Sequence, residues 1–109
     1  MITVRVESSS GGAEQHWNTL REVEESWITQ QVNRRRAAGE TVCVRVTVNH
    51  GAINVGFITP TCARSGGGGR PATTQEQTVI ELWDKQGLNK ADFSGGAIIS
   101  FLKQLDRYI

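Results

Sequence analysis

The sequence predicts an α+β fold in which helices cover one face of a small antiparallel sheet. Apolar residues alternate with polar ones over 42–48 and 53–57, on either side of the turn-forming pair His50-Gly51, as in a β-hairpin with one buried face. Apolar residues recur at helical spacing before residue 39 and after residue 73, which predicts helices on both sides of the hairpin. The expected order is β-α-β-β-α-α. The sheet would have three strands, with the last strand in the centre. A long first helix would cover the sheet, and a helical hairpin would form the C-terminal part.

Length and charge narrow the class of protein. A chain of 109 residues forms one domain, 1–109, with a single core. The net charge of +1 disfavours a protein built mainly to bind nucleic acid or anionic membranes. No apolar run approaches the ~20 residues that span a bilayer, and the amino terminus lacks the pattern of a secretory signal. We therefore expect a cytoplasmic protein that does not enter a membrane.

The first strand is expected at the amino terminus, where Ile2, Val4 and Val6 alternate with polar residues. After a flexible exit at 8–12 the period becomes helical, and Gly39 suits the left-handed residue past a helix end. The helix connects the first strand to the second by a right-handed crossover. Its apolar face would consist of Ala13, Trp17, Leu20, Val23, Trp27 and Ile28.

The register of the hairpin is predicted from its apolar residues. His50-Gly51 suits a two-residue turn flanked by Asn49 and Ala52, because glycine accepts positive φ freely. The apolar partners, all on one face, would then be Val48 with Ile53, Val46 with Val55, and Val44 with Phe57.

The two cysteines are expected to be free thiols. In this register Cys43 lies opposite Ile58, and Cys62 follows four residues later. At ~3.3 Å per extended residue the sulfur atoms would be roughly 13 Å apart, which is beyond disulfide reach. Free thiols would agree with a reducing, cytosolic location.

Two further helices follow a glycine-rich segment, 63–72, which is expected to be a flexible loop. Thr73 and Glu76 have the spacing of a capping box that opens the second helix. Gly87 would end it, with Leu88 against Trp83 as in a Schellman motif. The stripe of the last helix is Ile98, Phe101, Leu102, Leu105 and Ile109.

Several arginines are candidates for binding an anion or a nucleic acid. Arg64 and Arg70 flank the glycines, whose backbone N–H groups could hold phosphate. The Lys-Ser/Thr of a P-loop is absent, so a solubilising linker is the alternative interpretation. Arg34, Arg35 and Arg36 could contact nucleic acid, or could simply favour the C-terminal end of a helix dipole.

A catalytic constellation is not evident. Cys62 follows a strand and precedes a flexible loop, but His50 would lie at the remote end of the hairpin, so a Cys–His couple is disfavoured. Two cysteines and two histidines show no metal-ligand spacing. We expect no cofactor and no enzyme activity, with an enzyme using Cys62 as the third hypothesis.

The surface provides the remaining candidates. Glu24 falls within the apolar stripe of the first helix, where it is either an exposed helix edge or a polar group in an interface. Three tryptophans are many for one small core. A strand at the sheet edge is open to pairing with a partner strand, and Arg45 could partly guard it. The interaction candidates are Trp17, Glu24, Trp27, Arg45, Ile58 and Trp83.

These observations favour a small non-catalytic accessory protein of the adaptor, immunity or inhibitor type. It would bind another protein or a second copy of itself, within a larger complex or a homo-oligomer. The alternative is an anion- or nucleic-acid-binding module that uses the glycine-rich loop and the arginines 34–36, 64 and 70.

Overall fold

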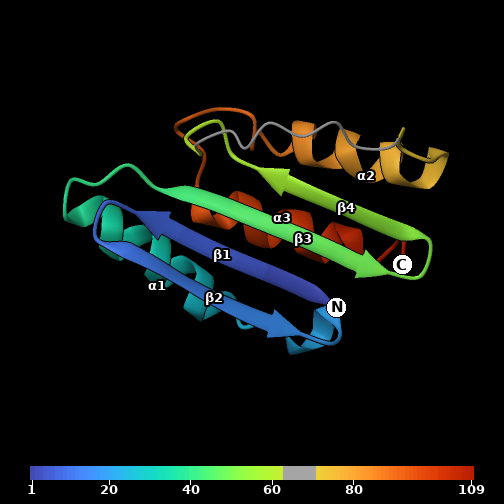
Figure 1. Ribbon diagram of the computed structural model, residues 1–109, viewed down its shortest axis with the longest axis horizontal. Coiled ribbons are helices and arrows are strands. Elements are labelled where there is room, and N and C mark those ends of the chain that lie inside the picture. Colours follow the sequence, from blue (N-terminus) through green and yellow to red (C-terminus); the bar gives the residue numbers. More distant parts are fainter. Residues whose placement is uncertain (63–70) are drawn as a thin grey trace.

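A computed structural model describes residues 1–62 and 71–109, and most of the predicted loop at 63–72 lies outside these residues. The described part is a small α+β domain with four strands and three α-helices (Figure 1). A single 3-10 helix, η1, precedes the first α-helix. The elements in chain order are β1 (Ile2–Ser8), β2 (Gly11–Trp17), η1 (Leu20–Glu22), α1 (Glu25–Ala37), β3 (Cys43–His50), β4 (Ile53–Ile58), α2 (Thr74–Lys85) and α3 (Gly95–Leu105).

The sheet has the order β2-β1-β3-β4, and every neighbouring pair is antiparallel. The prediction of three strands with 53–58 at the centre is therefore wrong in its detail, because β4 is an edge strand. The predicted crossover from the first strand is also wrong. The chain crosses instead from β2 through α1 to β3, and β1 lies between these two parallel strands.

The first helix is shorter than predicted, because residues 13–17 belong to β2. Ala13, Trp17 and Leu20 have spacings that fit a helix. In a strand, however, Ala13 and Trp17 share one face as well, with Glu14 and His16 on the other. Residues 11–17 form a strand because they pair with β1, with Ala13 opposite Val6 and Trp17 opposite Ile2.

The hairpin β3–β4 is shifted from the predicted register by two residues. Ile53 lies opposite His50 instead of Val48, and the loop is Gly51-Ala52. Gly51 has a φ of +58° and Ala52 does not have positive φ, a combination that fits a type II′ turn. Because side chains alternate with a period of two, such a shift leaves every side chain on its predicted face.

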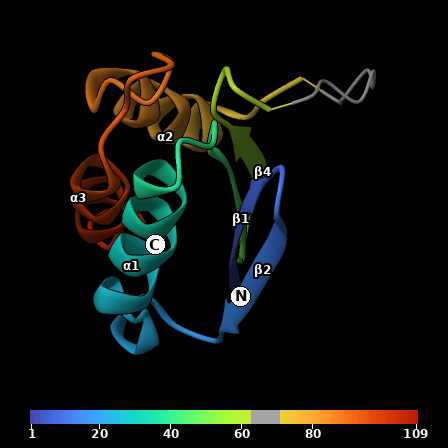
Figure 2. The same cartoon turned by 90° about the vertical axis from the view of Figure 1, so that its left-hand side faces the viewer.

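All three helices lie against the same face of the sheet, and the opposite face is uncovered by helices (Figure 2). The core between these layers combines valines of β1 and β3 with Ile28 and Val32 of α1. Phe57, Trp83 and Phe101 form an aromatic cluster in it, with ring centroids 4.9–5.1 Å apart. Burial of these apolar side chains is the main force that holds the two layers together.

Both ends of α2 and the C-terminal end of α1 are those that the sequence predicts. Thr73 and Glu76 form the capping box of α2. Gly87, with φ of +75°, donates to the carbonyl of Asp84, and Leu88 donates to that of Trp83, which is a Schellman motif. At Gly39 the same pattern ends α1. Within the described residues no helix combines the length and the apolarity needed to cross a membrane.

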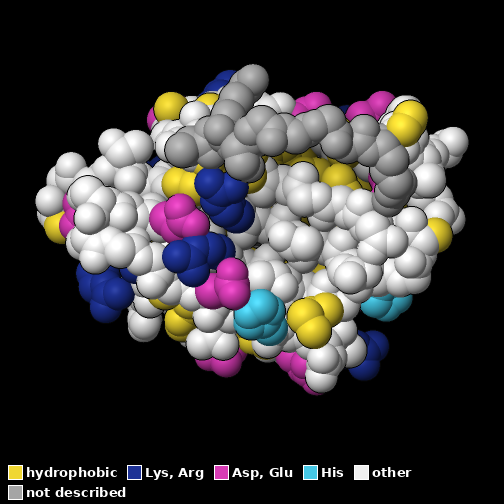
Figure 3. Space-filling view, viewed as in Figure 1, with side chains coloured by type: hydrophobic (Ala, Val, Ile, Leu, Met, Phe, Trp, Pro, Cys, Tyr) yellow, Lys and Arg dark blue, Asp and Glu magenta, His cyan; other side chains and the backbone are white. Residues whose placement is uncertain are grey.

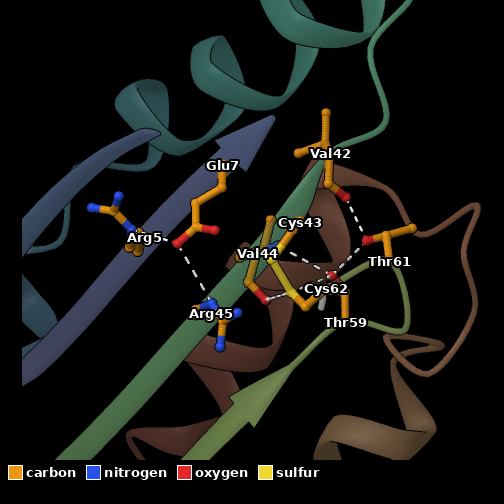
Figure 4. The surroundings of a disulfide bond; sticks show 9 residues. All are labelled: Arg5, Glu7, Val42, Cys43, Val44, Arg45, Thr59, Thr61 and Cys62. Carbon is orange, nitrogen blue, oxygen red and sulfur yellow. Dashed lines mark hydrogen bonds and ion pairs between the residues drawn. A yellow bond between two sulfur atoms is a disulfide. The ribbon is translucent and has the colours of Figure 1, made fainter. Parts of the chain in front are cut away.

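The cysteines form a disulfide bond, so the prediction of free thiols is wrong. Cys43 and Cys62 have Cα atoms 4.7 Å apart (Figure 4). The chain does not continue as a strand after β4. Thr59 still donates to the carbonyl of Val44, but the Cys62 N–H donates to the carbonyl of Thr59, and this turn brings Cys62 back to β3. A cytosolic location stays a prediction, without the support of free thiols.

Candidate interaction surface

The uncovered face of the sheet has a band of charged side chains across three strands. Basic and acidic groups alternate along it (Figure 3). Arg5 and Arg45 lie directly opposite each other in β1 and β3, a pairing of like charges that would repel. Glu7 relieves this repulsion, because its Oε1 lies 2.5 Å from Nε of Arg5 and 3.5 Å from Nε of Arg45. We call this set, with Glu14 and His16 of β2, the ionic band.

The ionic band ends at the outer strand β2. His16 Nε2 lies 2.8 Å from Oε2 of Glu14, and its Nδ1 lies 3.1 Å from Oγ1 of Thr3. Both ring nitrogens thus have partners, which orient the imidazole. Glu14 and His16 are exposed. They place a carboxylate and an imidazole side by side on the surface.

The backbone of β2 is open along its outer side. In an antiparallel ladder the N–H and C=O groups of one residue point to one side, and the sides alternate along the strand. The Asn49 N–H donates to the carbonyl of Met1, so odd-numbered residues of β3 and β1 bond to each other. Even-numbered residues of β1 then bond to odd-numbered residues of β2. The outward-pointing backbone groups are those of Gly12, Glu14 and His16, which we call the open edge.

β2 is an edge strand. The parts of α1 and η1 that project past it in Figure 1 lie in the helical layer (Figure 2), so no described segment lies beside it in the sheet. An extended strand with unpaired N–H and C=O groups is a template for a further strand. The open edge therefore offers main-chain hydrogen bonds, and its side chains offer one pair of charged or polar groups.

The opposite edge, β4, is partly covered. The outward-pointing residues there are Asn54, Gly56 and Ile58, because Thr59 bonds inward to Val44. The Asn54 N–H donates to Oε2 of Glu76 in α2, at 2.8 Å. Helix α2 runs alongside this strand (Figure 1), so a further strand could not follow β4 along its whole length.

A hydrogen-bond network around the buried Arg35 holds the turn between β1 and β2 against the end of α1. Arg35 is 7% exposed, and its Nη1 donates to Oγ of Ser8 at 2.6 Å and to the carbonyl of Gly11 at 2.8 Å. Glu40 accepts from Oγ of Ser8 at 2.5 Å and from the N–H of Ser10 at 3.1 Å. The hydrogen bonds from Ser8 and then Ser10 lower the pKa of Glu40 from 4.5 to about 2.

Two tryptophans hold the other end of β2. Trp17, the last residue of the strand, is buried and packs edge-to-face on Trp27 of α1, with ring centroids 6.0 Å apart. Trp27 is half-buried. β2 is thus fixed at both ends and exposed between them.

The predicted interaction residues are distributed over the whole molecule. Trp17 and Trp83 are buried in the core, and only Trp27 keeps part of its surface in solvent. Glu24 is exposed at the N-terminal end of α1 instead of within an apolar stripe. Arg45 belongs to the ionic band.

Ile58 is 40% exposed at the end of β4. Together with Glu24 and Arg45, it shows that the structure does not gather the predicted residues into one site.

The predicted anion-binding arginines do not form one patch. Arg35 is buried in the network at the turn between β1 and β2, and Arg36 lies over the ring of Phe93, 4.6 Å from its centroid. Arg34 is exposed and donates to Gln31. Arg64 and Arg70 lie outside the described residues.

Sequence reasoning missed the residues of the open edge, because residues 13–17 were assigned to a helix. Ala13 and Trp17 fit one face of a strand as well as one face of a helix, so the signal for a strand was limited to the Ser-Gly-rich segment directly before them. The partners of Arg35 carried no local signal, because Ser8 is 27 residues away.

Three observations concern the sites at which a small molecule or a metal ion could bind. Cys62 is in the disulfide and buried, so it cannot act as a nucleophile while this bond is intact. No group of three or more metal-ligating side chains occurs among the described residues. Three surface hollows have volumes of about 160, 300 and 310 Å³, near or below the lower end of the ~300–1,000 Å³ of usual ligand sites.

Comparison with known proteins adds no relationship: the chain matched no family model, no curated protein and no solved structure.

Proposed function

We propose that this protein is a small non-catalytic accessory protein that attaches to another protein chain through the open edge of β2. Adaptor, immunity and inhibitor proteins work in this way, by occupying a partner and not by converting a substrate. The observation that carries the proposal is the row of outward-pointing backbone groups of Gly12, Glu14 and His16, beside which no described segment lies.

Three properties of the edge support this role. β2 is seven residues long, enough for several main-chain hydrogen bonds with an added strand. It is held at one end by Arg35 and Glu40 and at the other by Trp27, so little conformational entropy would be lost on binding. Glu14 and His16 give the surface charge-based specificity.

A matched pair of proline variants tests the proposal. In Glu14→Pro the lost N–H points away from β1, so no hydrogen bond of the sheet is removed, and edge strands tolerate proline. In Gly56→Pro the same kind of group is lost from the other edge, where a new Cβ would meet nothing within 4 Å. The tagged full chain and both variants would be used to capture proteins from the source cell, quantified by mass spectrometry.

We expect the unmodified chain and Gly56→Pro to retain the same proteins and Glu14→Pro to lose them. Equal retention by all three would contradict the proposal. Thermal melts check that the variants are folded. If Glu14→Pro melts well below Gly56→Pro, His16→Pro repeats the measurement at the next outward position.

The alternative is an anion- or nucleic-acid-binding module. Of the candidate arginines in α1, Arg34 is exposed and would be available for such binding. Binding of a labelled single-stranded RNA at low salt, with a steep loss at moderate salt, would favour it. Binding near background at low salt would dispose of it.

A further inference from the structure

We infer that the occupant of the open edge is a second copy of this chain, with the two β2 strands antiparallel and Glu14 of each copy opposite His16 of the other. The inference rests on the proposed function of the edge and names its partner. The two four-stranded sheets would then form one continuous sheet across a two-fold axis.

Symmetry and backbone geometry limit the possible registers. Two copies related by a two-fold axis in this arrangement have antiparallel β2 strands, and only outward-pointing residues can exchange backbone hydrogen bonds. Glu14 can therefore face Gly12, Glu14 or His16 of the other copy. Facing Gly12 leaves Glu14 without a side-chain partner, and facing Glu14 opposes two like charges.

The third register forms two complementary contacts at once. Glu14 of the first copy meets His16 of the second, and the symmetric contact repeats it. Both side chains project on the uncovered face, so they meet on the same side of the joined sheet. Directly opposite residues of paired strands have Cβ atoms about 4.5–5.5 Å apart, which is closer than two residues that are two positions apart in one strand. Glu14 and His16 of one strand already meet, with Nε2 of His16 2.8 Å from Oε2 of Glu14, so the closer pair across the joint is within reach.

The covered face of the strands is complementary in the same register. Ala13 of one copy lies opposite Trp17 of the other, a small side chain beside a large one. Gln15 lies opposite Gln15 at the axis, where two amides can donate to and accept from each other. The half-buried Trp27, which packs on Trp17, adds apolar surface next to the joint.

Charge swapping on the full chain tests both the partner and the register. Glu14→Lys puts the new lysine opposite His16, and His16→Glu puts the new glutamate opposite Glu14, so each single change removes both complementary contacts. The double variant Glu14→Lys/His16→Glu restores opposite charges in the inferred register. In the register that pairs position 14 with itself, two lysines would face each other and nothing is restored. Glu81→Lys, an exposed position on α2, changes the net charge as Glu14→Lys does and is the control.

Analytical ultracentrifugation would give the dimer dissociation constants. We expect a dimer for the unmodified chain and for Glu81→Lys, and dissociation constants about tenfold higher for each single variant, since two cross-strand contacts are lost. The double variant should return toward the unmodified value. Melts of all five proteins would show that the swapped side chains leave the fold intact, and double variants as weak as the single ones would overturn the register.

Isotope-filtered NMR on a mixture of labelled and unlabelled chains reports the register directly. The inferred register brings Hα of Gln15 next to Hα of Gln15 in the other copy, whereas the like-charge register brings Hα of Ala13 next to Hα of Gln15. Observation of the second contact would overturn the inference.

The failure of this inference is distinct from the failure of the proposed function. A chain that stays monomeric at millimolar concentration, while Glu14→Pro still loses a different captured protein, overturns the inference and leaves the proposed function standing. A monomeric chain whose captured proteins do not depend on Glu14 overturns both.

Discussion

The two edges of the sheet have the same backbone chemistry and different surroundings. β2 and β4 each direct three residues outward, and each of these sets includes a glycine. On β4 the Asn54 N–H is taken by Glu76, helix α2 runs alongside, and the disulfide holds the chain after the strand against β3. On β2 the restraints, Arg35 and Trp27, act only at the two ends.

The difference shows what closes a sheet edge in this molecule. It is the presence of a neighbouring element with an acceptor in the right place, and not the composition of the strand. An edge that is rigid and unoccupied favours an added strand, because the hydrogen bonds are available and the ordering cost is low. Substitutions at either edge test this comparison.

The largest effect is expected from removal of the disulfide. Cys43→Ser/Cys62→Ser opens a loop with a sequence separation of 19 residues, which lowers the free energy of unfolding by about 3 kcal/mol. Chemical denaturation measures the loss, and reductant added to the unmodified chain should reproduce it. Hydrogen exchange should accelerate in β4 more than in β2, and equal acceleration in both strands would contradict the comparison.

A smaller effect is expected from Glu76→Gln at the covered edge. Glu76 is 1% exposed, and its carboxylate accepts from the N–H of Thr73 at 3.0 Å and of Asn54 at 2.8 Å. The amide puts an NH₂ donor against one of these N–H donors, which lowers the free energy of unfolding by about 2 kcal/mol. Chemical denaturation checks this, with the exposed Glu81→Gln on the same helix as control. A change no larger than that of the control would argue that Glu76 does not close the edge.

The smallest effect concerns the turn that holds β2. The folded state lowers the pKa of Glu40 from 4.5 to about 2, so its stabilising contribution is complete above pH 4.5 and is lost as the pH falls toward about 2. Melts of the unmodified chain and of Glu40→Gln should differ near neutral pH and converge over this acidic window. A difference that does not change with pH would show that the Glu40 carboxylate is not what holds the turn.

Much of the local structure could be predicted from the residues. The capping box of Thr73 and Glu76 and the Schellman motif at Gly87 are confirmed, because each depends on contacts within about one helical turn. The buried face of the hairpin is confirmed as well: Val46, Val48 and Phe57 are in the core. A register error of two residues does not change which face a side chain is on.

The candidate site could not be predicted, because the pattern of its residues fits both a helix and a strand. Ala13 and Trp17 fit one face of a helix and one face of a strand. Only pairing with β1 selects the strand and places Glu14 and His16 at an edge. Arg35 was an anion candidate by its place in a run of arginines, but Ser8 and the carbonyl of Gly11 occupy it inside the molecule.

The amino-acid sequence alone determined the fold class, both ends of α2 and the inward face of the hairpin, since side-chain period and capping act over a few residues. The tertiary structure decided the fourth strand, the strand order and the bond between Cys43 and Cys62. These three features depend on which segments, far apart in the sequence, pack against each other. The residues of one segment do not specify which other segment it will contact.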